Sequence, residues 1–159
     1  MIIGGIGERL ADRLSRGQAA AEALMGCTFE AYRPNGTTTV DNLRQQAYEL
    51  QPFTADIDGT PGKVQGGSTS TADTATEFVT VGGVRRPLLR GGLHIPISAP
   101  VPAAGDRGIG WEYHCAAVAT PGDQALVDRW YLVVNAPAKT YATSRRLDVV
   151  EVPVPEAFA

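Results

Sequence analysis

The stretch Trp111–Val152 constrains the fold of this chain more than any other part of the sequence. Its first run, Trp111–Val118, alternates apolar and polar side chains with the period of two that is typical of a half-buried strand. Two further runs, Arg129–Asn135 and Leu147–Val152, are aromatic or β-branched and too short for typical helices. The alternation sets Trp111, Tyr113, Cys115 and Ala117 on one face, and Glu112 and His114 on the other. These three runs predict a compact β-meander onto which the rest of the chain packs.

The connection between the first two of these runs carries strong turn signals. Thr120–Asp123 contains adjacent proline and glycine, which favour a turn. Asp123 is a good N-cap for one helical turn over Gln124–Asp128, because its carboxylate can accept hydrogen bonds from free backbone N–H groups.

Length and composition favour one loop-rich β domain. A chain of 159 residues can bury a sizeable core, and 18 glycines with 11 prolines favour strands and turns over a helical bundle. The formal net charge of −3 argues against a general nucleic-acid binder, although a protein that merely surrounds DNA remains compatible with it. Cys27 and Cys115 occupy apolar strand positions, so we expect buried free thiols.

Neither a membrane span nor a signal peptide is expected. No apolar run reaches the roughly 18 residues of a spanning helix. The first residues lack a basic start and a sustained apolar core, which a signal peptide requires. The sequence therefore predicts a cytoplasmic or virion-type product.

Ile6–Met25 is the helical segment that the sequence predicts. Its apolar side chains recur every four residues, and charged side chains fill the opposite side. Gly17 costs about 1 kcal/mol relative to alanine, which predicts a kink or two short helices, and Gly26 is a natural stop. Because only one stripe is apolar, we expect the helix to lie on its own barrel or on a neighbouring subunit.

Five more stretches are expected to contribute strands. Cys27–Arg33 alternates and is followed by the turn residues Pro34–Gly36. The stretches at 37–42 and 46–57 are ambiguous, since 42–49 could be helical, and we favour strand. Leu93–Ile97 alternates, and Pro96 requires that strand to end or to lie at an edge there. Glu77–Val81 is a short strand candidate.

Two segments are expected to be loops. Asp58–Thr76 has few bulky apolar residues and is predicted to be a long mobile loop. Val84–Arg90 is basic and is bracketed by two Gly-Gly pairs, which suggests an excursion between hinges. The whole predicts a mainly β fold, a small β-barrel or sandwich of six or seven short strands with an N-terminal helix and long loops. We expect a helical segment at 1–26, the barrel domain at 27–152 with the mobile loop at 58–76, and a C-terminal tail at 153–159.

Candidate catalytic and metal-binding patterns are weak. Gly4–Gly7 lacks the spacing of a phosphate-binding loop. Cysteines and histidines occur without zinc-ligand spacing, and the adjacent His114 and Cys115 point to opposite faces of a strand. A general acid–base set can be drawn from Asp106, Glu112, His114 and Asp123, but no nucleophile motif accompanies it. We therefore expect no enzyme activity, no metal and no cofactor.

A basic cluster stands between the two Gly-Gly pairs, and Arg145–Arg146 adds a second basic pair. As exposed loop residues these arginines could simply be solvated. Alternatively they face the DNA channel or an acidic neighbouring subunit, because guanidinium groups bind phosphate and carboxylate. The cluster consists of Arg85, Arg86 and Arg90.

Six segments in order resemble a known family, the small head–tail connector proteins of long-tailed actinobacteriophages, in the head-closure or "stopper" group. The resemblance extends from about Arg16 to Val152, and it departs at 42–53 and in the Thr/Ser-rich tract after Gln65. The segments are Arg16–Met25, Cys27–Pro34, Pro61–Gly67, Leu93–Ser98, Gly122–Pro137 and Ser144–Val152.

The resemblance implies a β-barrel subunit of a homo-oligomeric ring in the virion neck, assembled in the host cytoplasm. Six-fold symmetry is favoured over twelve-fold. The ring would seal packaged DNA and dock the tail, with a portal or adaptor above it and a tail terminator or tail tube below. Genomic double-stranded DNA would pass close to it without specific contacts, and no membrane or cofactor is implied.

Alternative functions remain open. One is another position in the same neck, as a portal-proximal adaptor or a tail terminator. A different class is a soluble ligand-binding β-barrel or an enzyme. A ring in solution favours a connector, whereas a strict monomer that binds small molecules favours the other class.

A stopper must change between closed and open states, and a loop with few apolar anchors moves at low cost. The loop at 58–76 is the predicted gate, with Val84–Gly92 as the next choice, although a surface loop without a role fits the same composition. The candidate gating residues are Gly59, Gly62, Lys63, Val64, Gly66 and Gly67.

Overall fold

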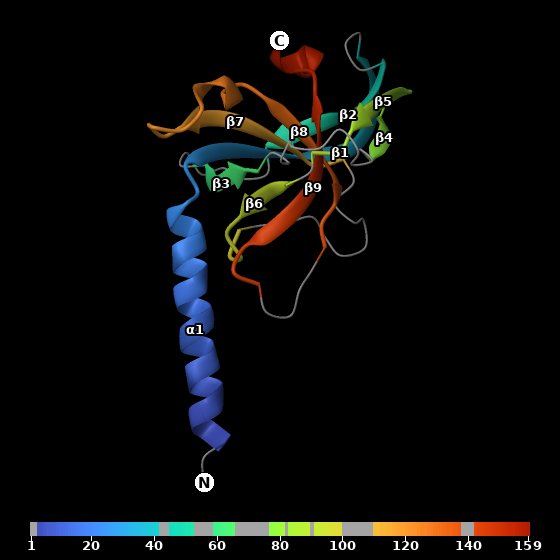
Figure 1. Ribbon diagram of the computed structural model, residues 1–159. Helices are drawn as coiled ribbons and strands as arrows, with labels where there is room; N and C mark the ends of the chain where they lie inside the picture. Colours follow the sequence, from blue (N-terminus) through green and yellow to red (C-terminus); the bar gives the residue numbers. More distant parts are fainter. Residues whose placement is uncertain are drawn as a thin grey trace.

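Antiparallel strands close into a barrel in the computed structural model (Figure 1). In the part of the chain that the structure describes, six strands run around it in the order β1-β3-β6-β9-β8-β7, and pairing between β1 and β7 closes the circle. β2 adds to β1 outside the barrel, and β4 pairs with β5 as a separate hairpin. The prediction of a mainly β barrel with an N-terminal helix is confirmed.

The described residues are 3–41, 45–52, 59–65, 77–81, 83–89, 91–99, 110–137 and 142–159. The helical elements are α1 (Ile3–Ala23) and the 3₁₀ turns η1 (Gln124–Leu126) and η2 (Glu156–Phe158). The strands are β1 (Cys27–Asp41), β2 (Gln45–Pro52), β3 (Thr60–Val64), β4 (Phe78–Val81), β5 (Val84–Pro87), β6 (Leu93–Ile95), β7 (Glu112–Val118), β8 (Trp130–Asn135) and β9 (Arg145–Val152).

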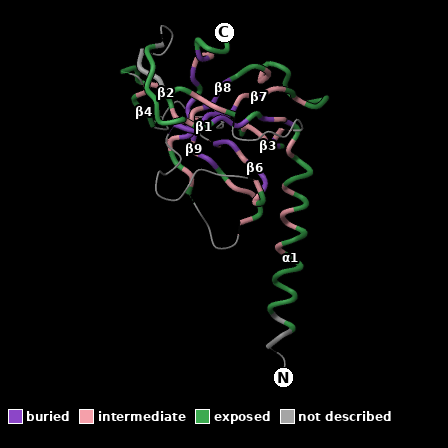
Figure 2. Tube along the Cα trace, turned by 180° about the vertical axis from the view of Figure 1, so that it is seen from behind, coloured by how far each residue is buried: buried purple, intermediate pink, exposed green. Residues whose placement is uncertain are grey.

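Aromatic packing fills the inside of the barrel. Phe29 on β1 is fully buried and meets the rings of Tyr113 and Tyr131 edge to face, at centroid distances of 6.3 and 6.4 Å. Such pairs add to the free energy of burying their large apolar surfaces. Buried aliphatic and cysteine side chains complete this cluster. They include Cys27, Leu93, Ile95, Cys115, Val133, Leu147 and Val149. Figure 2 colours the backbone of all buried residues purple.

A second apolar cluster lies on the outer face of the sheet. Tyr32, Trp130, Val150 and Val152 form it, and side chains of the β4–β5 hairpin pack against it. Phe158 from the C-terminal turn also covers it, with ring centroids 4.9 Å from Tyr32 and 5.1 Å from Trp130. The outer face of this barrel is therefore apolar where the hairpin and the C-terminus lie.

Two side chains of β7 differ in burial from the prediction, one of them because of this second cluster. Glu112 was expected in solvent, yet it is buried with 3% of its surface exposed. Its neighbours in register, Tyr32 and Leu132, belong to or pack on the second cluster, so its side of the sheet is covered. Ala117 was expected to be buried and is exposed, beyond a register shift between Thr28 and Phe29 where the β1–β7 pairing changes.

Helix α1 is continuous from Ile3 to Ala23, so the predicted kink at Gly17 is wrong. A Cβ at Gly17 would lie 2.9 Å from Thr143 Cγ2, which shows that the missing side chain serves a close approach to the barrel. The helix ends before Gly26 as expected, although Gly26 is not among the glycines with positive φ.

Three predicted loops or turns are strands instead. β1 runs through the turn expected at Pro34–Gly36, because a register shift between Pro34 and Thr38 and a φ of +92° at Gly36 accommodate the bend. The mobile loop predicted over 58–76 is wrong for β3, which pairs with β1 and β6. The excursion predicted at Val84–Arg90 is also wrong for its first half, since β5 forms a hairpin with β4 and Gly83 takes a φ of +78° in the turn.

Several local predictions are confirmed. The favoured strand assignment holds for β2, β6 ends before Pro96, and Cys27 and Cys115 are buried free thiols. Asp123 caps η1, and its carboxylate accepts a hydrogen bond of 2.9 Å from the N–H group of Ala125. These features depend on neighbours in sequence, which explains why the sequence shows them.

We predict that Phe29→Ala destabilises the fold by about 3–5 kcal/mol, because it removes a fully buried ring and leaves a cavity at the point where three aromatic side chains meet. Urea unfolding followed by tryptophan fluorescence measures the change. Val40→Ala is the control, since Val40 is 86% exposed and a surface change should stay within about 0.5 kcal/mol. Equal midpoints for the two variants would contradict the central role of Phe29.

Candidate functional site

Helix α1 stands away from the barrel over much of its length (Figures 1 and 2). It contacts the segment before β9 through Gly17, which faces Thr143, and Gln18, whose Nε2 donates a hydrogen bond of 3.2 Å to the Ala142 carbonyl. Towards its N-terminus, Leu10 is 46% exposed. The helix is thus attached in its C-terminal third and presents much of its surface to other molecules.

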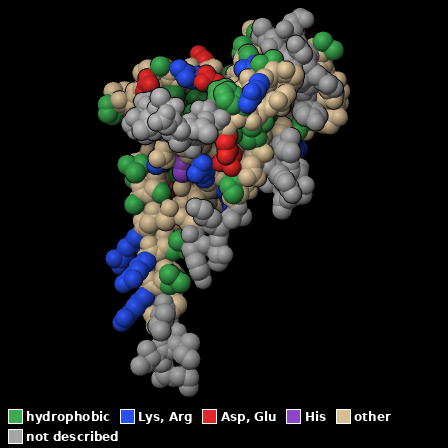
Figure 3. Space-filling model, turned by 45° about the vertical axis from the view of Figure 1, so that its right-hand side comes forward, with side chains coloured by type: hydrophobic (Ala, Val, Ile, Leu, Met, Phe, Trp, Pro, Cys, Tyr) green, Lys and Arg blue, Asp and Glu red, His purple; other side chains and the backbone are tan. Residues whose placement is uncertain are grey.

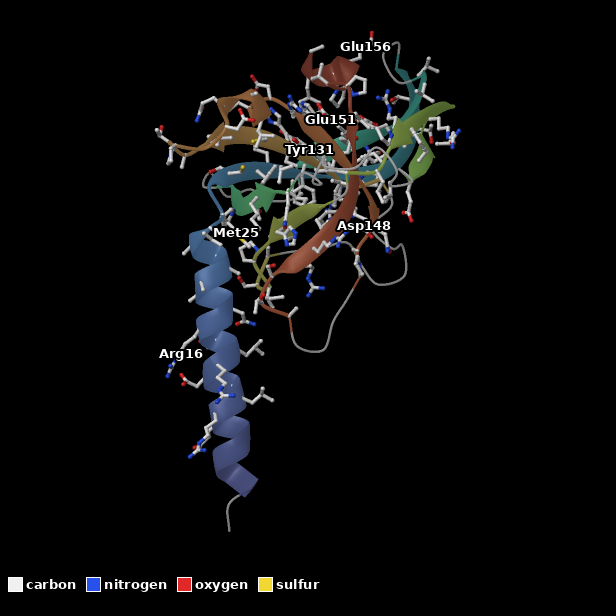
Figure 4. All side chains as sticks on the ribbon, in the orientation of Figure 1. Arg16, Met25, Tyr131, Asp148, Glu151 and Glu156 are labelled. Carbon is white, nitrogen blue, oxygen red and sulfur yellow. The ribbon has the colours of Figure 1, made fainter. Side chains whose placement is uncertain are left out.

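A cavity of about 610 Å³ lies where α1 meets the barrel. Leu14 and Gln18 line it from the helix, and β9 contributes Arg145, Arg146 and Asp148. Figure 4 shows Asp148 on β9, on the side of the barrel below Tyr131. Ile97 and Pro137 supply the apolar part of the lining. The cavity combines apolar and charged groups, which is compatible with a polar ligand or a side chain of another protein.

His94 is fixed in the wall of this cavity. Its Nε2 lies 2.9 Å from the Gly91 carbonyl and its Nδ1 lies 3.2 Å from Ser144 Oγ. Arg146 Nε pairs with Asp148 at 3.4 Å. Arg145 Nε is buried and has no hydrogen-bond partner among the described residues. Both ring nitrogens of His94 are therefore occupied by structural contacts.

A second polar cluster surrounds His114 on the outer face of the barrel. Its Nδ1 lies 3.0 Å from Glu30 Oε2, and its Nε2 lies 3.2 Å from Asp128 Oδ1. The imidazole stacks on Trp130 at a centroid distance of 4.8 Å. A protonated imidazole donates from both ring nitrogens, so it can satisfy the two carboxylates at once. The cluster joins β1, β7, β8 and the turn that carries Asp128.

The surroundings of this cluster shift the pKa values of Glu30 and Tyr32. The hydrogen bond from His114 holds the pKa of Glu30 below the usual carboxyl range, against the opposing effect of burial. The Tyr32 hydroxyl donates to the same carboxylate at 3.0 Å and also lowers that pKa. Burial, with the Glu30 contact second, raises the pKa of Tyr32 to about 12. These contacts link β1, β7 and β8.

The sequence analysis considered His114 but missed its partners. Glu30 is 84 residues away in sequence, and only the register of β1 against β7 brings it opposite His114. Trp130 is opposite His114 in the β7–β8 pairing. The alternation of each strand shows that these residues are surface candidates, but not which of them meet. Glu112, from the acid–base set, is buried with the second cluster, and Asp106 lies outside the described residues.

Arg85 and Arg86, two of the arginines singled out from the sequence, are on the β4–β5 hairpin. Arg85 is exposed, and its guanidinium carbon lies 4.4 Å from the centre of the Phe78 ring. Arg86 is partly buried, and its Nε has no hydrogen-bond partner among the described residues. Arg90 lies outside the described residues. The hairpin thus presents one accessible arginine beside exposed apolar side chains, Phe78 and Val84.

The candidate gating residues do not form one loop. Gly62, Lys63 and Val64 belong to β3, and Gly59 precedes it with a φ of +64°. A Cβ at Gly62 would lie 2.8 Å from the His94 carbonyl and 2.9 Å from the Phe29 ring. This glycine therefore allows close packing of strands, and backbone freedom is not its role. Gly66 and Gly67 lie outside the described residues, so a gate there stays a prediction.

In the described part of the chain, no group of three or more His, Cys, Asp or Glu residues is arranged to hold a metal ion. The same residues include no helix long and apolar enough to cross a membrane.

Residues 17–150 match the model of a family of unknown function (DUF6093), and the chain belongs to this family. Neither the curated proteins nor the solved structures give a match to the chain. The family match covers the second part of α1 and most of the barrel.

We predict a pH-dependent contribution from the Glu30–His114 contact. Because the pKa of Glu30 is lowered in the fold, its contribution is present above the usual carboxyl pKa of about 4.3 and disappears as the pH falls through the lower, folded-state value. Glu30→Gln should therefore lower the free energy of unfolding near neutral pH and have progressively less effect in acid. The loss should be about 1 kcal/mol or less, because the carboxylate is 49% exposed.

Urea unfolding of the wild type and of Glu30→Gln at about pH 3–7, a range that includes the carboxyl titration, tests whether the contact depends on the ionisation of Glu30. Glu49→Gln is the matched control, since Glu49 is exposed on β2. A pH-independent difference between the wild type and Glu30→Gln would show that the contact is not ionisation-linked.

Proposed function

We propose that the protein is a subunit of a head-to-tail connector ring in a phage neck, of the head-closure type, which seals packaged DNA and docks the tail. One observation carries the proposal: α1 extends from the barrel with an exposed N-terminal half. Its 21 residues span about 32 Å at 1.5 Å per residue. An amphipathic helix gains most of its stability by packing against a partner, which this barrel supplies only in part.

A second exposed region supports assembly. The β4–β5 hairpin presents Phe78 (47% exposed) and Val84 (40% exposed) at the end of the barrel opposite α1 (Figures 1 and 2). Val40, near the end of β1, is 86% exposed. Single exposed apolar residues are common, but two projecting elements that each carry them suit a subunit with neighbours on more than one side.

The charge and the chemistry agree with a connector. The formal net charge is −3, which suits a channel that lets DNA slide without binding it tightly. The resemblance of the sequence to stopper proteins further implies a position in the neck and a six-fold ring. It also implies that a portal or adaptor and a tail protein are the neighbours. Assembly in the host cytoplasm and incorporation into the virion follow from the same proposal.

The proposal predicts that the full-length protein forms a ring-sized oligomer as its concentration rises. Native mass spectrometry measures the number of subunits, and protein identification in purified particles tests the location. A strict monomer at all concentrations, absent from the particles, would overturn the proposal. Chemical cross-linking within particles then distinguishes a stopper from an adaptor or a terminator by the neighbour that it captures.

Arg85 gives a further prediction for the hairpin. Arg85→Glu should reduce the joining of heads to tails at least tenfold in an infection complementation assay, because it reverses an accessible charge beside exposed apolar side chains. Arg129→Glu makes the same charge change between η1 and β8 and is the control, and its urea midpoint is measured as well because Arg129 pairs with Glu151. Equal joining by both variants would show that the hairpin does not contact a neighbour or the channel.

A further inference from the structure

We propose that α1 packs beside α1 of the next copy in a parallel arrangement, with a basic flank of one helix facing an acidic flank of its neighbour. This inference rests on the proposed ring and specifies how its subunits meet. The basic flank consists of Arg9, Arg13 and Arg16, and the acidic flank consists of Glu8, Asp12 and Glu22.

The two flanks follow from the helical repeat. Each residue turns an α-helix by about 100°, so positions separated by four and seven residues return to nearly the same side. Arg9, Arg13 and Arg16 therefore fall within an arc of about 60°. Figure 3 shows basic side chains gathered along one side of the exposed part of the helix. The acidic residues are centred about 100° away from this line.

The contact with the barrel fixes how these flanks are presented. Leu14, Gly17, Gln18 and Ala21 are the partly buried residues, and their mean direction points to the subunit's own barrel. On the same helical projection, the basic flank lies about 125° to one side of that direction and the acidic flank about 130° to the other. Figure 4 shows Arg16 pointing away from the barrel. Both flanks are exposed on opposite sides of the attached face.

The shapes of the flanks are complementary as well. Leu10 (46% exposed) and Leu24 (69% exposed) lie between the barrel-facing side and the basic flank. The acidic flank instead carries the small residues Ala11, Ser15 and Ala19, all exposed. Large side chains on one helix can thus enter the space left by small ones on the next. Because surface ion pairs contribute little free energy, we assign the contact energy to these apolar groups and the choice of partner to the charges.

One of the charges, Glu22, is unfavourable in the isolated helix. Glu22 stands in its last turn, where the partial negative charge of the helix end repels a carboxylate, and the last turn has no basic residue. Within the helix, Arg16 pairs with Asp12 at 2.5 Å. The remaining acidic and basic groups gain more from a partner with the opposite arrangement.

The arrangement of the flanks favours a ring of copies over a two-fold dimer. A two-fold dimer that used one flank twice would place like charges together, which is unfavourable. A parallel contact between different flanks leaves one flank free on each side, and such a contact repeats until it closes. Without an axial shift, Arg9 and Arg13 stand at nearly the same height as Glu8 and Asp12 of the neighbour, since adjacent positions differ by about 1.5 Å.

Complementary charge reversal tests the proposal in the full-length protein. One variant carries Arg9→Glu and Arg13→Glu, so both of its flanks are acidic. The other carries Glu8→Arg and Asp12→Arg, so both of its flanks are basic. Each variant alone should assemble at least tenfold more weakly than the wild type, and an equal mixture should recover the ring with alternating copies in native mass spectra.

Controls separate this outcome from other effects. Glu49→Arg adds positive charge at an exposed site away from α1, and it should assemble like the wild type. Circular dichroism checks that the helix persists, and a variant that has lost it is judged by the recovery in the mixture. Raised salt should weaken the wild-type ring and the mixed ring to a similar extent, because each interface has the same number of opposite-charge pairs in both.

The outcomes distinguish the two proposals. A wild-type protein that never assembles overturns the proposed function and this inference together. A wild-type ring with unchanged assembly of both variants, or variants that the mixture does not restore, overturns only the helix contact. Unchanged assembly with lost binding of a double-stranded DNA fragment by Arg9→Glu/Arg13→Glu would assign the basic flank to DNA and likewise overturn the contact.

Discussion

The pairing of β1 with both β3 and β7 is the constraint on which the rest of the structure depends. Its first residues hydrogen-bond to β3 on one side and to β7 on the other, which closes the barrel around Phe29. Its later residues pair with β2 outside the barrel. One long strand thus joins the core to an outer arm, and a register shift between Pro34 and Thr38 interrupts its pairing with β2.

Local sequence signals predicted much of the fold and little of the candidate site. Alternation identified the strand after Trp111, and turn residues identified the cap at Asp123, because neighbouring residues determine both. β3 was missed because its Thr-Pro-Gly-Lys-Val sequence has few strand formers, and only pairing with β1 and β6 makes it a strand. The contact between Glu30 and His114 depends on register, which no single strand reveals.

Gly17 and Gly62 also show that the local sequence does not reveal why a glycine is present. From the sequence, Gly17 was read as a weakness in a helix and Gly62 as a flexible point in a loop. In the fold each permits a close approach, to Thr143 in one case and to Phe29 and the His94 carbonyl in the other. A glycine signals that a Cβ is unfavourable, but the reason lies in residues that are distant in sequence.

The junction between α1 and β1 couples the helix to barrel closure. The Gly26 carbonyl accepts a hydrogen bond of 2.7 Å from the Ala119 N–H group at the end of β7. Cys27, the residue after Gly26, is the first residue of β1 to pair with β7 and β3. The side chain of Gln18 attaches the helix to the segment that leads into β9, by its hydrogen bond to the Ala142 carbonyl. With two attachments about one third of its length apart, the helix cannot change direction without disturbing strands on both sides. In a ring whose helices pack side by side, the helices would therefore also set the orientation of each barrel, and the hairpin at the far end would reach its neighbours at a defined position.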